Sequence, residues 1–191
     1  MIHPETELRP VDPRVGMGVV ATRRIPRGTI TWALDSLDQI LTPERVVSLL
    51  PLQRAFVDRY SYIDAHGNSV LCHDLGKYVN HHCDPATRGV GEFFDIAVRD
   101  IEAGEELTCD YGETILDGAF PCACGAANCR GVVRTGVMTD GAEAWDTLVR
   151  ATVLLLLSVP QPLWPYLRDP QEADELARGQ RLVPPRSDYW G

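Results

Sequence analysis

Short apolar segments separated by turn residues run along the N-terminal part of the chain. Residues 11–32 predict a strand, a turn at Pro26–Gly28 and a second strand, and β-forming residues at 61–64 lead into a turn at 65–68. Weak alternation of apolar and polar positions at 92–99 and β-forming residues within 106–111 predict two further short strands. We therefore expect this part of the chain to be mostly β.

Helical signals occur in two places. Thr42 followed by Pro43 and Glu44 is typical of a helix start, and the helical pattern continues after Pro51, so residues 42–60 predict a short helical insert. From about residue 141, apolar positions recur at helical spacing, and residues 171–177 predict a second short helix. The expected fold class is mostly β with short helices, followed by a C-terminal helical extension.

Composition narrows the possible functions. The chain has 191 residues and a formal net charge of -9, which argues against direct nucleic-acid binding because phosphate contacts need clustered Lys and Arg. A cationic partner or substrate fits this charge better. The N-terminus lacks a basic stretch followed by an apolar one, which predicts an intracellular protein that is not secreted. The apolar run at 151–159 is shorter than the ~20 residues that cross a bilayer, so we expect no membrane span.

Cysteine spacing points to a metal. The chain has six cysteines, and a disulfide framework is typical of short secreted chains, so metal binding is the preferred interpretation. Cys122, Cys124 and Cys129 form a C-x-C-x4-C cluster among Gly and Ala, and such a tight loop can wrap an ion. A closed tetrahedral site needs a fourth ligand, for which the residues alone leave open Cys72, Cys83, Cys109, His81 and His82.

Three sequence motifs precede this cluster. They are Gly16-Met17-Gly18, the run from Tyr78 through Asn80-His81-His82 to Cys83, and residues 101–112, which end in Asp110-Tyr111-Gly112. Each motif alone is weak, but all three occur in order and are followed by the cysteine cluster. Residues 9–133 therefore resemble the SET-domain protein lysine methyltransferases that carry a post-SET zinc loop.

The resemblance implies an architecture. It implies a SET-domain fold of small, mostly antiparallel sheets, in which the segment around Asn80 passes through a loop near Tyr111 to form a pseudoknot. Residues 1–117 would form the SET domain with its helical insert near 42–60, and residues 118–133 the post-SET zinc loop. Residues 134–191 lie outside the resemblance and would form the helical C-terminal extension and tail.

The resemblance also implies site residues. Tyr111 corresponds to the catalytic tyrosine of the family, and we expect Tyr62, together with Tyr60, to form a wall of the lysine channel. Cys83 corresponds to the cysteine that completes a structural zinc site with Cys122, Cys124 and Cys129. S-adenosylmethionine would be bound by residues of the first two motifs, namely Gly16, Met17, Gly18, Tyr78, Asn80 and His81.

The implied function is S-adenosylmethionine-dependent methylation of lysine on a basic protein or peptide, such as a histone or another Lys-rich tail. The alternative is a catalytically inactive SET-like binding or scaffold module. Cys109 stands where the family commonly has Phe or Tyr, a position that influences how many methyl groups fit. The sequence leaves the substrate, the number of methyl groups transferred and the oligomeric state undetermined.

Overall fold

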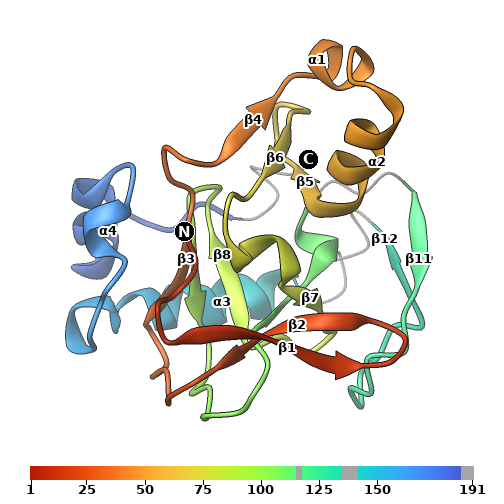
Figure 1. Cartoon of the computed structure of the whole chain (residues 1–191). Helices are drawn as coiled ribbons and strands as arrows, with labels where there is room; N and C mark the ends of the chain where they lie inside the picture. The colour runs from red at the N-terminus through yellow and green to blue at the C-terminus, as the bar shows by residue number, and fades with distance from the viewer. Residues whose placement is uncertain (115–117, 135–141, 186–191) are drawn as a thin grey trace.

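Five small sheets make up most of the fold. The computed structural model describes residues 1–114, 118–134 and 142–185 (Figure 1). Four of the sheets are antiparallel: β1 (Thr6–Asp12) with β2 (Gly16–Ala21); β3 (Ile30–Ala33), β9 (Phe94–Ala97) and β8 (Thr87–Val90); β4 (Gln39–Leu41), β6 (Ser69–Leu71) and β5 (Ser61–Ile63); and β11 (Ala119–Pro121) with β12 (Val132–Arg134). The fifth sheet is the parallel pair β7 (Asn80–His81) and β10 (Thr108–Cys109). The predicted fold class, mostly β with short helices, is confirmed.

Two strands differ from the sequence expectation. Strand β1 was not predicted, because Pro10 and charged residues weaken its apolar pattern, and it forms by pairing with β2. The strand expected within 106–111 is shorter, since β10 covers Thr108 and Cys109 and Glu106 forms only an isolated bridge with Val20. Asp110 then caps a 3-10 turn, η2 (Tyr111–Glu113), by accepting a hydrogen bond from the Gly112 N–H at 2.8 Å. This turn directs Tyr111 away from the strand.

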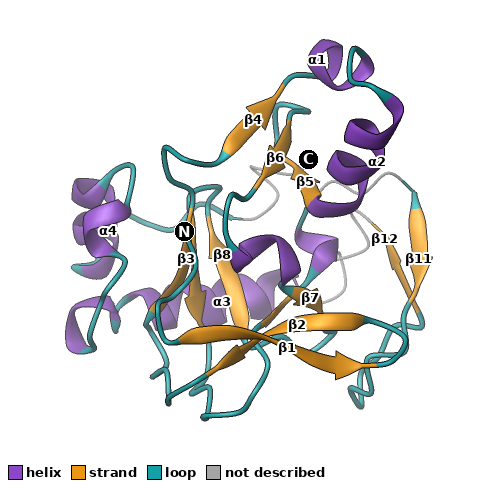
Figure 2. Ribbon diagram, viewed as in Figure 1, coloured by secondary structure: helices purple, strands orange, loops and turns teal. Residues whose placement is uncertain are grey.

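The helical insert lies where the sequence predicts it. Helix α1 (Pro43–Val47) begins with Thr42, whose hydroxyl oxygen accepts a hydrogen bond from the Arg45 N–H at 3.3 Å. Helix α2 (Pro51–Tyr60) has Pro51 in its first turn and runs directly into β5. Both helices lie with the β4–β6–β5 sheet at one end of the molecule, opposite the β1–β2 hairpin (Figures 1 and 2).

The C-terminal extension packs on the sheet β3–β9–β8. It contains α3 (Ala142–Val153), the 3-10 turns η3 (Leu156–Ser158) and η4 (Trp164–Tyr166), and α4 (Pro170–Ala177), in agreement with the two predicted helices. Buried Val153 and Leu156 share one core cluster with Ile30 and Ile96 of the sheet. A hydrogen bond also joins the extension to this sheet: the side-chain oxygen of Gln161 accepts from the Ile30 N–H at 2.8 Å. The extension and the sheet therefore have a common hydrophobic core.

A second core cluster lies beneath the β1–β2 hairpin and includes Val19, Ile101 and Leu107. It also contains Cys72, one of the candidates for the fourth metal ligand, which is 6% exposed. Among the described helices, none is both long enough and apolar enough to cross a membrane.

Candidate active site and metal centre

Pairing of β7 with β10 brings the second and third motifs together. Thr108 lies beside Asn80 and Cys109 beside His81, in parallel register. The His82 N–H extends this pairing by donating to the Cys109 carbonyl at 2.9 Å. The two segments that the resemblance places together in the pseudoknot are thus neighbours, and Asn80 and His81 lie next to the end of the strand that leads to Tyr111.

Asn80 connects this pair to the first motif. Its side-chain nitrogen donates to the Met17 carbonyl at 2.9 Å and to the Glu106 carboxylate at 2.7 Å. Both hydrogens of the amide are therefore used, which leaves the amide oxygen of Asn80 as its acceptor for a ligand. Three of the predicted cofactor residues, Met17, Gly18 and Asn80, lie together here.

The absence of a side chain at Gly18 leaves room for the side chains of Glu106 and Asn80. A Cβ atom at Gly18 would lie 2.2 Å from a carboxylate oxygen of Glu106 and 2.9 Å from the side-chain nitrogen of Asn80. Any larger residue would displace both side chains. Glu106 was not identified as a site residue from the sequence, although its position within the third motif offered a signal.

Two of the other three predicted cofactor residues, Gly16 and Tyr78, lie in different surroundings. Gly16 sits at the exposed end of the β1–β2 hairpin with a φ of 97°, where a side chain would meet no atom within 4 Å. Tyr78 ends the 3-10 turn η1 (Leu75–Tyr78), and its ring packs edge-on against Tyr60 with centroids 5.4 Å apart. Gly16 thus shapes the turn, and Tyr78 contacts the helical insert.

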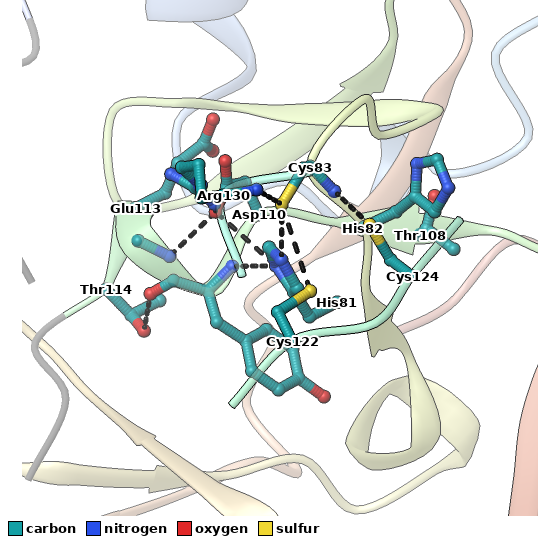
Figure 3. Close-up of polar contacts among 12 residues, drawn as sticks. His81, His82, Cys83, Thr108, Asp110, Glu113, Thr114, Cys122, Cys124 and Arg130 are labelled. Carbon is teal, nitrogen blue, oxygen red and sulfur yellow. Dashed lines mark hydrogen bonds and ion pairs between the residues drawn. The ribbon is translucent and has the colours of Figure 1, made fainter. Parts of the chain in front are cut away.

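The His81 side chain points into the protein. It is 5% exposed, its Nδ1 accepts a hydrogen bond from the Tyr111 N–H at 3.2 Å, and its Nε2 lies 3.3 Å from Cys83 Sγ (Figure 3). Burial lowers the pKa of His81 to about 4, so the imidazole is neutral at physiological pH. Both ring nitrogens already have partners within the protein.

Tyr111 is held at both ends. Its hydroxyl donates to the Val79 carbonyl at 2.8 Å, and its backbone N–H donates to His81. Its ring packs against Phe120 of β11, with centroids 5.8 Å apart. Burial raises the pKa of the Tyr111 phenol well above its usual value, so the hydroxyl stays protonated and cannot act as a base at neutral pH. The sequence analysis missed Phe120, because its role depends on where the cysteine loop folds.

A cleft of about 860 Å³ opens beside Tyr111. Tyr62 lies in its wall and packs edge-on against Trp32 with ring centroids 6.0 Å apart. Charged residues also line the cleft, and its aromatic and apolar residues come from segments far apart in the sequence, among them Tyr60, Tyr62, Val79, Cys109, Tyr111 and Phe120. Their arrangement can surround a narrow apolar side chain and keep water away from its end.

Four cysteines gather beside this cleft. The Sγ atoms of Cys83, Cys122, Cys124 and Cys129 all lie within 4.8 Å of one another. Cys122 Sγ is 3.9 Å from Cys83 Sγ and 3.8 Å from Cys129 Sγ. A tetrahedral zinc ion with Zn–S bonds of about 2.3 Å holds its sulfurs about 3.8 Å apart, so the four thiolates fit such an ion. Of the five candidates for the fourth ligand, Cys83 is the one that lies among the other three sulfurs.

Arg130 ties the cysteine loop to the third motif. Its guanidinium donates to the Asp110 carboxylate at 2.5 Å, and its backbone N–H donates to Cys83 Sγ at 3.4 Å. The Asp110 side chain is fully buried, and the same carboxylate oxygen caps the turn that carries Tyr111. Arg130 was not identified from the sequence, because a single Arg after a cysteine carries no signal of its own.

Comparison with known proteins agrees with this geometry. Residues 16–112, slightly more than half of the chain, match the SET domain family. The H3 lysine-4 specific histone-lysine N-methyltransferase of Eremothecium gossypii is 38% identical over 85 residues, which cover 39% of this chain and 8% of that protein. Histone-lysine N-methyltransferase EHMT1 of Mus musculus is 30% identical over 140 residues, 61% of this chain and 10% of that protein. The chain thus spans about a tenth or less of the length of these two curated relatives.

A solved structure shares the fold. The methyltransferase domain of human Histone-lysine N-methyltransferase SETMAR superposes with a TM-score of 0.53 at 19% sequence identity, covering 71% of this chain and 59% of that one. The family match extends from Gly16, at the exposed end of the hairpin, to Gly112 in the turn after Tyr111. It therefore includes all three motifs that meet around Asn80. This chain belongs to the SET domain family.

Proposed function

We propose that the protein is an S-adenosylmethionine-dependent protein-lysine N-methyltransferase that acts on a basic protein. The observation that carries this proposal is the position of the Tyr111 phenol. Tyr111 lines the cleft, while the neighbouring strand β7 holds Asn80 against Met17 and Glu106. A substrate side chain and a cofactor can therefore approach the same point from two directions.

The residues around Gly18 suit the proposed cofactor. The Asn80 amide oxygen and the Glu106 carboxylate are hydrogen-bond acceptors, and the second carries a negative charge, so both suit the ammonium group of the methionine portion. We propose further cofactor contacts from the backbone of Gly16, Met17, Gly18 and His81, with Tyr78 supporting the pocket. When bound, the cofactor supplies an activated methyl group on a sulfonium.

The protein must present an uncharged lysine amine in line with that methyl group. Holding a lysine neutral at pH 7 costs about 4 to 5 kcal/mol from its reference pKa of ~10.4. An apolar channel lowers this cost because burial disfavours the ammonium form, so no side chain has to act as a base. Tyr62, Phe120 and Tyr111 are the aromatic residues proposed to form this channel.

Tyr111 is proposed to orient the amine. Since its hydroxyl hydrogen is donated to the Val79 carbonyl, the phenolic oxygen can accept only, and it presents a lone pair to an N–H of the incoming amine. This interaction would place the nitrogen lone pair toward the methyl group. Alignment of this kind is the main contribution that a protein makes to a displacement reaction.

We propose that Cys83, Cys122, Cys124 and Cys129 hold one structural zinc ion. The ion would fix the loop 118–133 beside the cleft and thereby hold Phe120 against Tyr111. Four thiolates leave no open position, so the ion would not take part in the chemistry. We further propose the division into a SET domain (1–117), a post-SET loop (118–133) and a C-terminal extension (134–191).

The test is a transfer assay with S-adenosylmethionine carrying a labelled methyl group. Histone H3 is the first substrate to try, because a relative is named for lysine 4 of H3, and a whole-cell lysate is the second. We expect labelling by the wild type and a loss of about 100-fold or more in Tyr111→Phe, typical for removal of one orienting hydroxyl in an active site. Tyr166→Phe, at a 47% exposed residue of the extension, is the matched control and should behave as wild type.

Two results would contradict the proposal. Equal transfer by wild type and Tyr111→Phe would remove Tyr111 from the mechanism. No transfer, together with no binding of S-adenosylmethionine in calorimetry, would favour the alternative of an inactive binding or scaffold module.

A further inference from the structure

The sulfur of Cys83 has two polar contacts outside the cysteine cluster. The Arg130 N–H donates to it at 3.4 Å, and His81 Nε2 lies 3.3 Å from it (Figure 3). Neither contact comes from the other three cysteines. Cys83 is therefore the point at which the cysteine cluster touches the rest of the site.

The orientation of the His81 ring fixes where its proton lies. Nδ1 faces the Tyr111 N–H at 3.2 Å and must accept, because a backbone N–H can only donate. Because Nδ1 accepts, the ring proton lies on Nε2, the atom that faces Cys83 Sγ. His81 thus donates to a sulfur with one nitrogen and accepts from Tyr111 with the other.

The Tyr111 ring is held by the same short segment of chain at two places. Its backbone bonds to the His81 ring, and its hydroxyl bonds to the carbonyl of Val79, two residues earlier. The rings of His81 and Tyr111 also pack with centroids 5.6 Å apart. A shift of His81 would therefore move Tyr111.

We infer that His81 is a positioning residue that couples metal occupancy of the cysteine cluster to the placement of Tyr111. This inference rests on the proposed zinc site and lysine transfer. A zinc-bound thiolate would carry negative charge and would be a good acceptor for the Nε2–H of His81. Zinc binding would therefore fix the orientation of the His81 ring, and the ring in turn would fix the Tyr111 N–H that donates to it. Partners of this kind outside the ligand set orient the ligands and strengthen metal binding.

Two substitutions of His81 test the contacts of its two ring nitrogens separately. His81→Asn places a carboxamide oxygen near the position of Nδ1, so it keeps an acceptor for the Tyr111 N–H, but it is too short to donate to Cys83. His81→Gln extends an N–H toward Cys83 and gives up the acceptor beside Tyr111. His82→Asn is the matched control, because His82 turns to the Asp84 carbonyl at 2.6 Å instead.

The measurements are zinc transfer to a chromogenic chelator, absorption of the cobalt(II)-substituted protein in the thiolate charge-transfer region, and kcat and KM for labelled methyl transfer. We expect His81→Asn to bind zinc about 10- to 100-fold more weakly, with a shifted charge-transfer band. His81→Gln should keep zinc and the band near wild type while kcat falls and the KM for S-adenosylmethionine changes little. His82→Asn should match wild type in all three measurements.

Equal zinc binding and an unchanged cobalt spectrum in folded His81→Asn would overturn the inference. Parallel loss of zinc and kcat in both His81 variants would also overturn it, because that pattern indicates packing alone. Circular dichroism verifies folding in each case. The zinc and cobalt measurements do not depend on methyl transfer. A wild type that binds zinc but transfers no methyl group would contradict the proposed function. The role of His81 is judged separately, by comparing the two His81 variants with wild type.

Discussion

Replacement of Leu156 by Ala tests whether the C-terminal extension is part of the domain core. Leu156 is 0% exposed and lies in one cluster with Ile30 and Ile96 of the β3–β9–β8 sheet. The next residue, Leu157, is 49% exposed. The two leucines therefore form a matched pair in one turn of chain, with the same side chain and different burial.

The expected cost follows from this difference. Truncation of a fully buried leucine removes its transfer free energy and leaves a cavity, at about 2 to 5 kcal/mol. Leu157→Ala should change the free energy of unfolding by about 0.5 kcal/mol or less. For a chain of this size a loss of about 3 kcal/mol lowers Tm by about 6 to 12 °C.

The assay is thermal and urea unfolding, followed by circular dichroism and by tryptophan fluorescence. We expect one cooperative transition that moves as a whole in Leu156→Ala and hardly moves in Leu157→Ala. In Leu156→Ala, an early transition seen only in the helical circular dichroism signal, followed by a main transition at the wild-type midpoint, would show that the extension unfolds independently. Equal shifts in the two variants would refute the burial argument itself.

Three further predictions concern the methyl groups, the metal and the pH dependence. Cys109 lies in the cleft wall, so Cys109→Tyr should fill space and shift products toward monomethyl-lysine, and an unchanged product distribution in mass spectrometry would count against it. Metal analysis should find about one zinc per chain, since four thiolates form a single closed site. Cys124→Ser or a strong chelator should reduce methyl transfer strongly while the N-terminal sheets stay folded, which circular dichroism will show as a retained β signal. His3 is 5% exposed and burial lowers its pKa, so at acidic pH the unfolded chain binds more protons than the folded one. The free energy of unfolding should then decrease as pH falls below about 6.5, and the decrease should be smaller in His3→Gln, which urea titrations at several pH values will measure.

Local chemistry made the helices predictable from sequence. Thr42 and Pro43 mark the start of α1 by capping and fixed φ, and the apolar spacing around Val149 and Val153 marks α3. These signals act within a few residues, so they persist whatever the rest of the chain does. Strand β1 was missed for the opposite reason, because its partner β2 rather than its own pattern makes it a strand.

The sequence predicted which types of residue form the candidate site, but only part of how they contact one another. The cysteine spacing indicated a metal loop, and motif order pointed to Asn80 and Tyr111. Asn80 lies on β7, and Tyr111 lies in the turn that follows the adjoining strand β10. Phe120, Glu106 and Arg130 were missed, since each acts through a contact with a distant segment. The cofactor contact of His81 stays a prediction, and nothing in the sequence indicated that its side chain lies between Cys83 and Tyr111.

The sequence by itself determined the residue types of the site: cysteines at a spacing typical of metal ligands, a glycine at position 18, and a tyrosine after Asp110. The tertiary structure alone decided which atoms meet. Parallel pairing of β7 with β10 places His81 against a residue thirty positions away, and the cysteine loop closes on Cys83 from further still. Such contacts depend on the three-dimensional path of the backbone, and hydrogen bonds require atoms within about 3.5 Å, a condition that no local pattern of residues can specify.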